Sequence, residues 1–299
     1  MKPTWSVTIP TYNSAAFLEE TLLSVLKQDL GEERMEIIVV DNCSTDNTEE
    51  IVEKTGGGRI KFYSNDENIG AIGNFNRCLE AATGELIHIL NSDDLVILNF
   101  YKEIENCFEA NAEASLVVCT AELIDESGKH KGYSPSIESL SAPSDDIEEL
   151  IYTNPVRTPA VVVKKNAYLK VGKFDKNLSH VADWDMWVRI ISNFKGVYLD
   201  KVLCKYRVHS KNETSRVFFS GEDILEYERI FQKFESMGYP IENKKYKQIL
   251  KKFAENNYSI IYSKYRYNKE AVVSLRAIYK RYASPLEYLK LAVKLKYLQ

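Results

Sequence analysis

The chain has 299 residues, a formal charge of −4, and 44% hydrophobic and 27% charged residues, which is typical of a globular protein. This length allows one large α/β domain or two ordinary ones, and it excludes a disordered chain or a disulfide-stapled miniprotein. No apolar run approaches the ~20 residues of a membrane span, and the opening "MKPTWSVTIP" lacks a signal-peptide core. The five cysteines are scattered without CxxC spacing, so we expect a cytoplasmic protein without a zinc site or disulfides.

The first 120 residues alternate short apolar runs with helical patterns. Strands are predicted at 6–10, 36–41, 59–64, 85–90 and 114–120. Helices are predicted at 13–28, 44–54, 71–82 and 95–110. This alternation predicts an α/β fold, in which a mainly parallel central sheet is flanked by helices and forms a Rossmann-like nucleotide-binding half.

The rest of the chain is less regular. Residues 125–155 are polar and read as a long loop, and 160–165 and 196–209 read as strands, with helices at 165–171 and 183–194 between them. From 221 onward the sequence reads as helices broken near 238–240 and 284–285. We therefore expect a catalytic domain over 1–212, with a nucleotide-binding half (1–120) and an acceptor-side half (121–212), and a helical extension over 213–299.

The extension differs from the body in charge. Residues 242–299 carry 14 basic and 4 acidic side chains, a net charge of +10, which leaves −14 for residues 1–241. Helices rich in Lys and Tyr suit a peripheral contact with an anionic membrane face; a bundle packed on the catalytic domain, or a dimer contact, is the alternative. A nucleic-acid partner is not expected, because the acidic body would repel phosphate.

Three polar clusters follow predicted strands: Pro10-Thr11-Tyr12-Asn13, Asp41-Asn42 and Asn91-Ser92-Asp93-Asp94. The carboxyl ends of parallel strands meet at one edge, so these clusters should converge on one site. The two adjacent carboxylates suit Mg²⁺ or Mn²⁺ bound with a nucleoside diphosphate; capping of the following helix is the alternative. The chain has no GxxxxGK[ST] or GxGxxG loop, which indicates a nucleotide that serves as a leaving group.

Five segments carry a family resemblance. "VTIPTYN", "VVDNCSTDNT", "NIGAIGNFNRCLEAATGELIHILNSDD", "VGKFDKNLSHVADWDMWVRI" and "YRVH" lie in this order between residues 6 and 209. They resemble the signatures of family 2 glycosyltransferases with the GT-A fold. The resemblance implies an inverting bacterial enzyme that moves a sugar from a nucleotide sugar, usually UDP-linked, to a glycan or lipid-linked acceptor with Mn²⁺ or Mg²⁺. Surface polysaccharide synthesis is the implied setting.

The resemblance also implies residue roles. The implied nucleotide-binding residues are Pro10, Thr11, Tyr12, Asn13, Asp41, Asn42, Asn68, Gly70, Asn76, Ser92 and Asp93. The implied metal ligands are Asp93, Asp94 and His209. The family often has Asp where this chain has Asn91, a departure that removes one negative charge from the metal motif.

Asp183 stands where the family has its general base, a carboxylate that takes the proton of the attacking hydroxyl. The preceding residue is Ala182, where the family usually has Glu. Asp185 is the rival base, although two residues so spaced do not share a helix face. Trp187 is expected in the core. Candidates for diphosphate or acceptor contacts are Arg157, Trp184, Asp185 and Arg207.

Two other functions stay open at this point. A sugar nucleotidyltransferase would need a basic, Gly-rich N-terminal loop, which "PTYNSAAF" does not provide. A non-catalytic nucleotide-sugar-binding protein is suggested by Asn91 and Ala182, the two departures from the family pattern.

Overall fold

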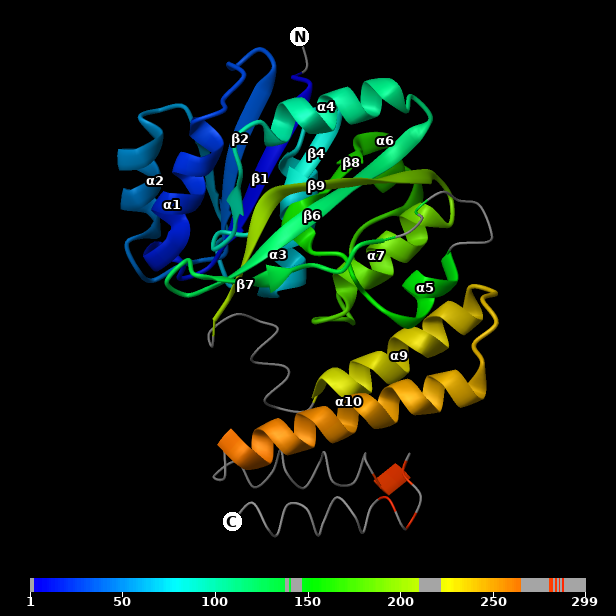
Figure 1. The fold of residues 1–299 in the computed structure, drawn as a ribbon. Helices are drawn as coiled ribbons and strands as arrows, with labels where there is room; N and C mark the ends of the chain where they lie inside the picture. The colour runs from blue at the N-terminus through cyan, green and yellow to red at the C-terminus, as the bar shows by residue number, and fades with distance from the viewer. Residues whose placement is uncertain are drawn as a thin grey trace. The chain divides into compact units, whose positions relative to one another are not determined.

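The computed structural model describes residues 3–137, 140, 147–209, 222–264 and five positions between 280 and 287. The chain divides into two compact units, Met1–Val208 and His209–Gln299 (Figure 1). The first unit is built on a nine-stranded sheet in the order β3-β2-β1-β4-β8-β6-β9-β5, with β7 paired to β6.

The first half of this sheet is parallel. Its strands are β1 (Trp5–Thr11), β2 (Met35–Asp41), β3 (Lys61–Ser64) and β4 (Leu86–Ile89). Its helices are α1 (Ala15–Leu26), α2 (Thr48–Gly56) and α3 (Gly70–Ala81). Every residue of β1, β2 and β4 is buried, as expected for strands covered on both faces. Helix α3 packs on β1 and β2, and α1 lies beside α2 and contacts β5 (Figure 1).

The second half is mixed. Its strands are β5 (Leu95–Val96), β6 (Ala114–Asp125), β7 (His130–Tyr133), β8 (Val161–Lys164) and β9 (Lys195–Val208). Its helices are α4 (Phe100–Ala110), α5 (Ile147–Tyr152), the 3₁₀ turn η1 (Thr158–Ala160), α6 (Lys165–Val171) and α7 (Ala182–Ile191). Strand β8 runs antiparallel to β4 and β6, whereas β9 runs parallel to β6. Parallel pairing is therefore found in the first half and between β6 and β9.

Two predicted elements differ from the observed ones. Leu95 and Val96 form β5 instead of starting a helix, because they pair with Lys205 and Cys204 of β9. The predicted loop over 125–155 contains β7 and α5. The predicted strand over 196–209 is confirmed as one long element, β9, whose pairing with β6 shifts register on both sides of Thr120. Strand β5 depends on a contact distant in sequence, whereas β7 forms a local hairpin with β6.

A buried histidine joins the two halves of the sheet. His88 of β4 is fully buried and stacks on Phe100 with ring centroids 4.6 Å apart. Its Nε2 lies 2.9 Å from the carbonyl oxygen of Pro159 in η1. Burial lowers the pKa of His88 to about 4, and the Pro159 bond opposes this in part. His88 is thus neutral at physiological pH and fixes η1 near the carboxyl end of β4.

The second unit contains helices α9 (Glu222–Ser236) and α10 (Asn243–Lys264), which contact each other. Phe231 of α9 meets Tyr246 of α10 edge to face at 5.2 Å. Among the described residues, no helix combines the length and apolar character needed to cross a membrane. Residues 265–279 and those after 287, which include much of the Lys- and Tyr-rich segment, lie outside the described residues. The expected membrane contact stays a prediction.

Candidate active site

The loops after β1 and β2 are tied to each other by side chains. Asn13, whose φ is +49°, accepts a hydrogen bond at Oδ1 from the Thr45 amide at 2.8 Å. Its own amide donates to Ser44 Oγ at 2.8 Å. The Ala15 amide at the start of α1 donates to Asp46 Oδ2 at 3.0 Å. The first two polar clusters predicted to converge therefore do lie together.

Asp41 closes β2 with a buried, fully supported carboxylate. Its oxygens accept hydrogen bonds from the Ser44 hydroxyl at 2.5 Å, the Ser44 amide at 3.0 Å and the Ser64 hydroxyl at 3.2 Å. In the parallel register Thr11 lies opposite Asp41. The Thr11 hydroxyl is buried and has no hydrogen-bond partner among the described residues. Tyr12, by contrast, is 47% exposed. This edge of the sheet therefore presents a buried hydroxyl, Thr11, next to an exposed aromatic ring, Tyr12.

Asparagine side chains organise the start of α3. Asn42 Nδ2 donates to Asn68 Oδ1 at 2.8 Å, and the Gly70 amide donates to the same oxygen at 2.9 Å. Gly70 has a φ of +76°, a conformation that favours glycine. These three predicted residues are brought together.

Asn76 occupies a different place from the one expected. Its Nδ2 donates to the Phe174 carbonyl at 3.0 Å, and its Oδ1 accepts from the Phe174 amide at 2.8 Å. The side chain is buried, and both ends of its amide are used. Asn76 thus holds the segment before α7, and we no longer assign it a nucleotide contact.

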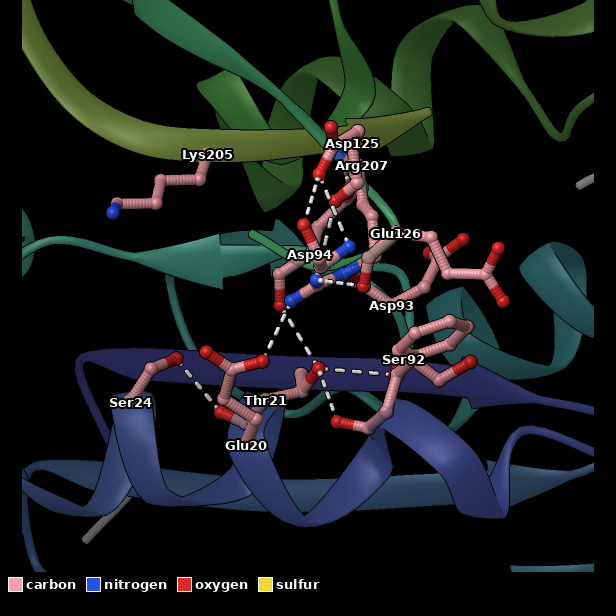
Figure 2. Close-up of polar contacts among 12 residues, drawn as sticks. Glu20, Thr21, Ser24, Ser92, Asp93, Asp94, Asp125, Glu126, Lys205 and Arg207 are labelled. Carbon is pink, nitrogen blue, oxygen red and sulfur yellow. Dashed lines mark hydrogen bonds and ion pairs between the residues drawn. The ribbon is translucent and has the colours of Figure 1, made fainter. Parts of the chain in front are cut away.

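The turn after β4 contains one buried and one half-buried carboxylate. Asp94 is 0% exposed, and its Oδ1 accepts from the Arg207 amide at 2.8 Å (Figure 2). Its Oδ2 accepts from Asn91 Nδ2 at 3.0 Å. Burial and the neighbouring charge of Asp93 raise the pKa of Asp94 well above its usual value. Asp93 is half-buried. Asn91 is therefore an internal support, which explains an amide at this position.

These observations revise the predicted metal ligands. Asp94 is enclosed and bonded within the protein, so we place it as a support of the turn. His209 directly follows β9, as the first residue of the second unit. Among the described residues, no three His, Cys, Asp or Glu side chains cluster as a metal site. Mg²⁺ and Mn²⁺ can also be bound by one or two carboxylates together with the phosphates of a substrate, and Asp93 fits this mode of binding.

Arg207 is committed to the fold. Its side chain is 2% exposed, and its Nη2 donates to Glu20 Oε2 at 2.6 Å. Its Nε donates to the Asp93 carbonyl at 2.8 Å, and its guanidinium lies 4.9 Å from the Phe17 ring centroid. The diphosphate contact suggested by the sequence is therefore replaced by a supporting role.

Asp183 lies in the first turn of α7 and is partly exposed. Its oxygens accept hydrogen bonds from the Trp184 amide at 2.6 Å, Asn154 Nδ2 at 3.3 Å and the Thr158 hydroxyl at 3.4 Å. Burial raises the pKa of Asp183, while the charges of His180 and Arg157 oppose the rise. A half-buried carboxylate with a raised pKa suits proton abstraction.

The other predicted residues of α7 are structural. Asp185 is buried, and its Oδ2 accepts from Arg189 Nε at 2.8 Å. Trp184 is buried and its Nε1 donates to the Leu150 carbonyl. Trp187 is also buried, as expected, with its ring edge-on to Phe174. The expected acceptor contacts of Trp184 and Asp185 are therefore replaced by packing roles.

Contacts connect the Asp183 region to the Asp93 turn. Thr158 begins η1, which packs on β4 and β9. The Arg157 guanidinium lies 5.7 Å from the ring centroid of Tyr206. The next residue, Arg207, binds Asp94. The general-base candidate and the acidic turn thus lie at the same edge of the sheet.

The sequence model of one family, "Glycosyl transferase family 2", matches residues 6–163. The chain belongs to this family. A relative, an uncharacterized glycosyltransferase MJ1057 of Methanocaldococcus jannaschii, is 28% identical over 72% of this chain and 75% of its own length. The poly(ribitol-phosphate) beta-N-acetylglucosaminyltransferase TarS of Staphylococcus aureus is 29% identical over 83% of this chain and 43% of its own length.

Solved structures of glycosyltransferases share the fold. Residues 1–349 of S. aureus TarS in complex with UDP-GlcNAc superpose with a TM-score of 0.66 at 23% identity, covering 97% of this chain and 84% of that one. The mannosyltransferase PcManGT of Pyrobaculum calidifontis, in complex with GDP-Man and Mn²⁺, gives 0.59 at 19% identity, covering 98% and 80%. These findings confirm the GT-A fold and glycosyltransferase assignment of this family 2 protein, and they leave the nucleotidyltransferase and non-catalytic alternatives without support.

Three supporting residues on α1 were not anticipated. The Thr21 hydroxyl lies 3.0 and 2.9 Å from the carbonyl oxygens of Ser92 and Asp94 and shares its one proton between them. Ser24 Oγ accepts from the Val96 amide at 3.2 Å. Glu20 binds Arg207. The sequence feature that could have indicated these supports is the position of Thr21 and Ser24 beside the apolar face of the predicted helix.

Proposed function

We propose that this family 2 glycosyltransferase moves a sugar from a nucleotide sugar, UDP-linked, to a hydroxyl of a glycan or lipid-linked acceptor. The transfer inverts the configuration at the anomeric carbon and belongs to bacterial surface polysaccharide synthesis. The observation that supports this most directly is Asp183: a partly exposed carboxylate with a raised pKa, held at the same sheet edge as Asp93.

In the proposed reaction, Asp183 takes the proton of the acceptor hydroxyl. The hydroxyl oxygen forms a bond to the anomeric carbon on the face opposite the nucleotide, and the bond from that carbon to the diphosphate oxygen breaks. The configuration is therefore inverted. Hydrogen bonds from Asn154 and Thr158 orient the carboxylate, and the raised pKa makes it a better base than a solvent-exposed Asp.

On the donor side, we assign the base and ribose to the edge formed by Thr11, Tyr12 and Asp41. Thr11 provides a buried hydroxyl without a partner among the described residues, and Tyr12 provides an exposed ring. The proposed uracil contact of Asp41 is supported by its fixed carboxylate. Pro10, Asn13, Asn42, Asn68, Gly70 and Ser92 complete the proposed nucleotide-binding set. The bound UDP-GlcNAc and GDP-Man of the two structural relatives support a nucleotide-sugar donor.

Asp93 is the residue we assign to the divalent metal, Mn²⁺ or Mg²⁺, together with diphosphate oxygens. When bound, such an ion neutralises the negative charge on the departing diphosphate. His209 remains a proposed additional ligand. Arg157 is the one cationic candidate for a diphosphate or acceptor contact that we retain, because it lies near Asp183 and is half-buried.

The proposal includes a cytoplasmic location with peripheral contact at the inner membrane face. The support is the net charge of +10 over residues 242–299. Exposed lysines on α10, such as Lys244, Lys247 and Lys252, belong to this segment. The enzyme would then reach a membrane-bound acceptor at the surface of the membrane that carries it.

A screen of nucleotide sugars tests the function. UDP-GlcNAc, UDP-glucose, UDP-galactose and GDP-mannose are each incubated with the protein and Mn²⁺, and nucleoside diphosphate release and thermal stabilisation are measured. We expect one UDP sugar to stabilise the protein and to release UDP slowly, with release lost in Asp183→Asn. Stabilisation by none of the four, or release unaffected by the substitution, contradicts the proposal.

A further inference from the structure

The turn at 92–94 is held through its main chain. The Thr21 hydroxyl shares its proton between the carbonyls of Ser92 and Asp94, and Arg207 Nε donates to the Asp93 carbonyl at 2.8 Å. All three main-chain oxygens of the turn therefore accept hydrogen bonds from elsewhere in the unit. None of these bonds uses the carboxylate of Asp93. The backbone that carries this carboxylate is fixed from α1 on one side and β9 on the other.

Arg207 supports the turn through both its main chain and its side chain. Its main-chain amide donates to the Asp94 carboxylate at 2.8 Å, and its Nε donates to the Asp93 carbonyl, so Arg207 binds two consecutive residues of the turn. Its Nη1 lies 3.1 Å from the Glu126 carbonyl in the turn after β6, and its Nη2 reaches Glu20 on α1 (Figure 2). A planar guanidinium can donate in three directions at fixed angles, whereas a lysine ammonium cannot reproduce this fork.

Glu20 provides the counter-charge. Its Oε2 lies 2.6 Å from Nη2 of the buried Arg207, while its own side chain is 60% exposed. A buried guanidinium needs an anionic partner to offset its desolvation. Removing the charge of Glu20 should therefore leave the Arg207 guanidinium without its anionic partner, whereas the largely solvated Glu20 side chain leaves no cavity behind.

We propose that Arg207 is a positioning residue that fixes Asp93 for the metal–diphosphate complex, and that Glu20 holds the Arg207 guanidinium in this role. The inference rests on the proposed function, since it assumes that Asp93 meets the metal and the nucleotide. Arg207 itself touches neither. Helix α1 and the end of β9 thereby become part of the donor site, although they contribute no ligand to it.

Binding of Mn²⁺ and UDP measures this role without turnover. Free Mn²⁺ is followed by electron paramagnetic resonance in the presence of UDP, and UDP binding is titrated calorimetrically with and without Mn²⁺. We expect Arg207→Lys to weaken Mn²⁺-dependent UDP binding about tenfold, the lower end of what loss of an outer-shell support costs a metal site. Binding of UDP without metal should not change.

Two further variants sharpen the test. Glu20→Gln should weaken Mn²⁺-dependent binding about threefold, as suits a partly solvated ion pair. It should also lower the melting temperature, because the buried guanidinium loses its anionic partner, so binding is measured well below the melting temperature of the variant. Because Glu20 acts through Arg207, the double variant should bind as weakly as Arg207→Lys alone. Should Arg207→Lys fail to fold, Glu20→Gln decides the question.

Arg59 offers a matched control at the opposite edge of the sheet. Its guanidinium pairs with both Asp29 oxygens at 2.7 Å and donates to the Met35 carbonyl at 2.6 Å. Arg59→Lys should lower the melting temperature and leave Mn²⁺-dependent UDP binding intact. Wild-type affinity in folded Arg207→Lys, or in Glu20→Gln, or equal weakening in Arg59→Lys, overturns the positioning role. Absence of Mn²⁺-dependent UDP binding in the wild type overturns the proposed metal–nucleotide site itself.

Discussion

The carboxylate of Asp185 accepts a hydrogen bond from Nε of Arg189 at 2.8 Å, one helical turn further along α7. Arg189 also donates to the carbonyls of Val171 and Lys173 at 2.8 and 3.0 Å. This buried ion pair ties α7 to the end of α6 and to the residues directly after it. Asp185 is thereby occupied, and Asp183, on a different side of the helix, is left as the candidate base.

Asp185→Asn should therefore destabilise the protein rather than remove its chemistry. The substitution leaves the Arg189 guanidinium without its charge partner, and breaking a buried pair in this way costs about 3 kcal/mol. Denaturant unfolding measures this loss, and UDP affinity of the folded fraction should stay at the wild-type value. A stable but inactive Asp185→Asn would reverse the assignment of the two carboxylates.

The acid limb of the pH–rate profile should report Asp183. The base must be ionised to accept a proton, and its pKa is raised above the usual value of 3.8. Activity should therefore fall as pH decreases through this raised pKa, at a higher pH than for an exposed Asp. The dependence of kcat/KM on pH measures the free enzyme. A profile that is flat down to pH 4 argues against Asp183 as the base.

Asp93→Asn should abolish the Mn²⁺-dependent part of UDP binding. The half-buried carboxylate is the one we assign to the metal, and an amide is a much weaker ligand for a hard cation. The melting temperature is measured alongside as the control for folding, and the hydrogen bonds to the main chain of the turn and to the Asp94 carboxylate remain available in this variant. Calorimetric titration with and without Mn²⁺ gives the answer, and an unchanged difference between the two would remove Asp93 from the metal site.

His88 makes stability depend on pH. Its pKa falls from 6.5 in the unfolded chain to about 4 in the fold, so the unfolded state binds a proton first as pH decreases. The contribution is fully present above pH 6.5 and is lost towards pH 4, by about 3 kcal/mol in total. Unfolding free energies of the wild type and His88→Gln should converge over this window, since Gln cannot take up a proton. Parallel pH curves for the two proteins contradict this.

Much of the site could be predicted from local sequence because strand ends are local features. The apolar runs before Thr11, Asp41 and Asn91 define buried strands, and parallel pairing then brings their ends to one edge. The structure also shows that Asn13 and Asp41 hold loops in place through hydrogen bonds. A single sequence does not predict this role, because it does not show which loop residues their side chains meet.

The rest depended on pairing between distant segments. Arg207 and Asp94 are 113 residues apart, and nothing in "YRVH" distinguishes an arginine that binds phosphate from one that supports a turn. Likewise β5 exists because β9 reaches it. Spacing alone did indicate that Asp183 and Asp185 would differ, and the ion pair to Arg189 supplies the physical reason.

The central claim is that Asp183 is the base of an inverting transfer. The most direct test measures UDP release from the UDP sugar selected in the screen, with wild type and Asp183→Asn, alongside calorimetric UDP affinity for both proteins. Loss of a positioned base should lower kcat by about 10²- to 10⁴-fold, while the UDP dissociation constant and melting temperature stay close to wild type. Release by Asp183→Asn at the wild-type rate would contradict the account.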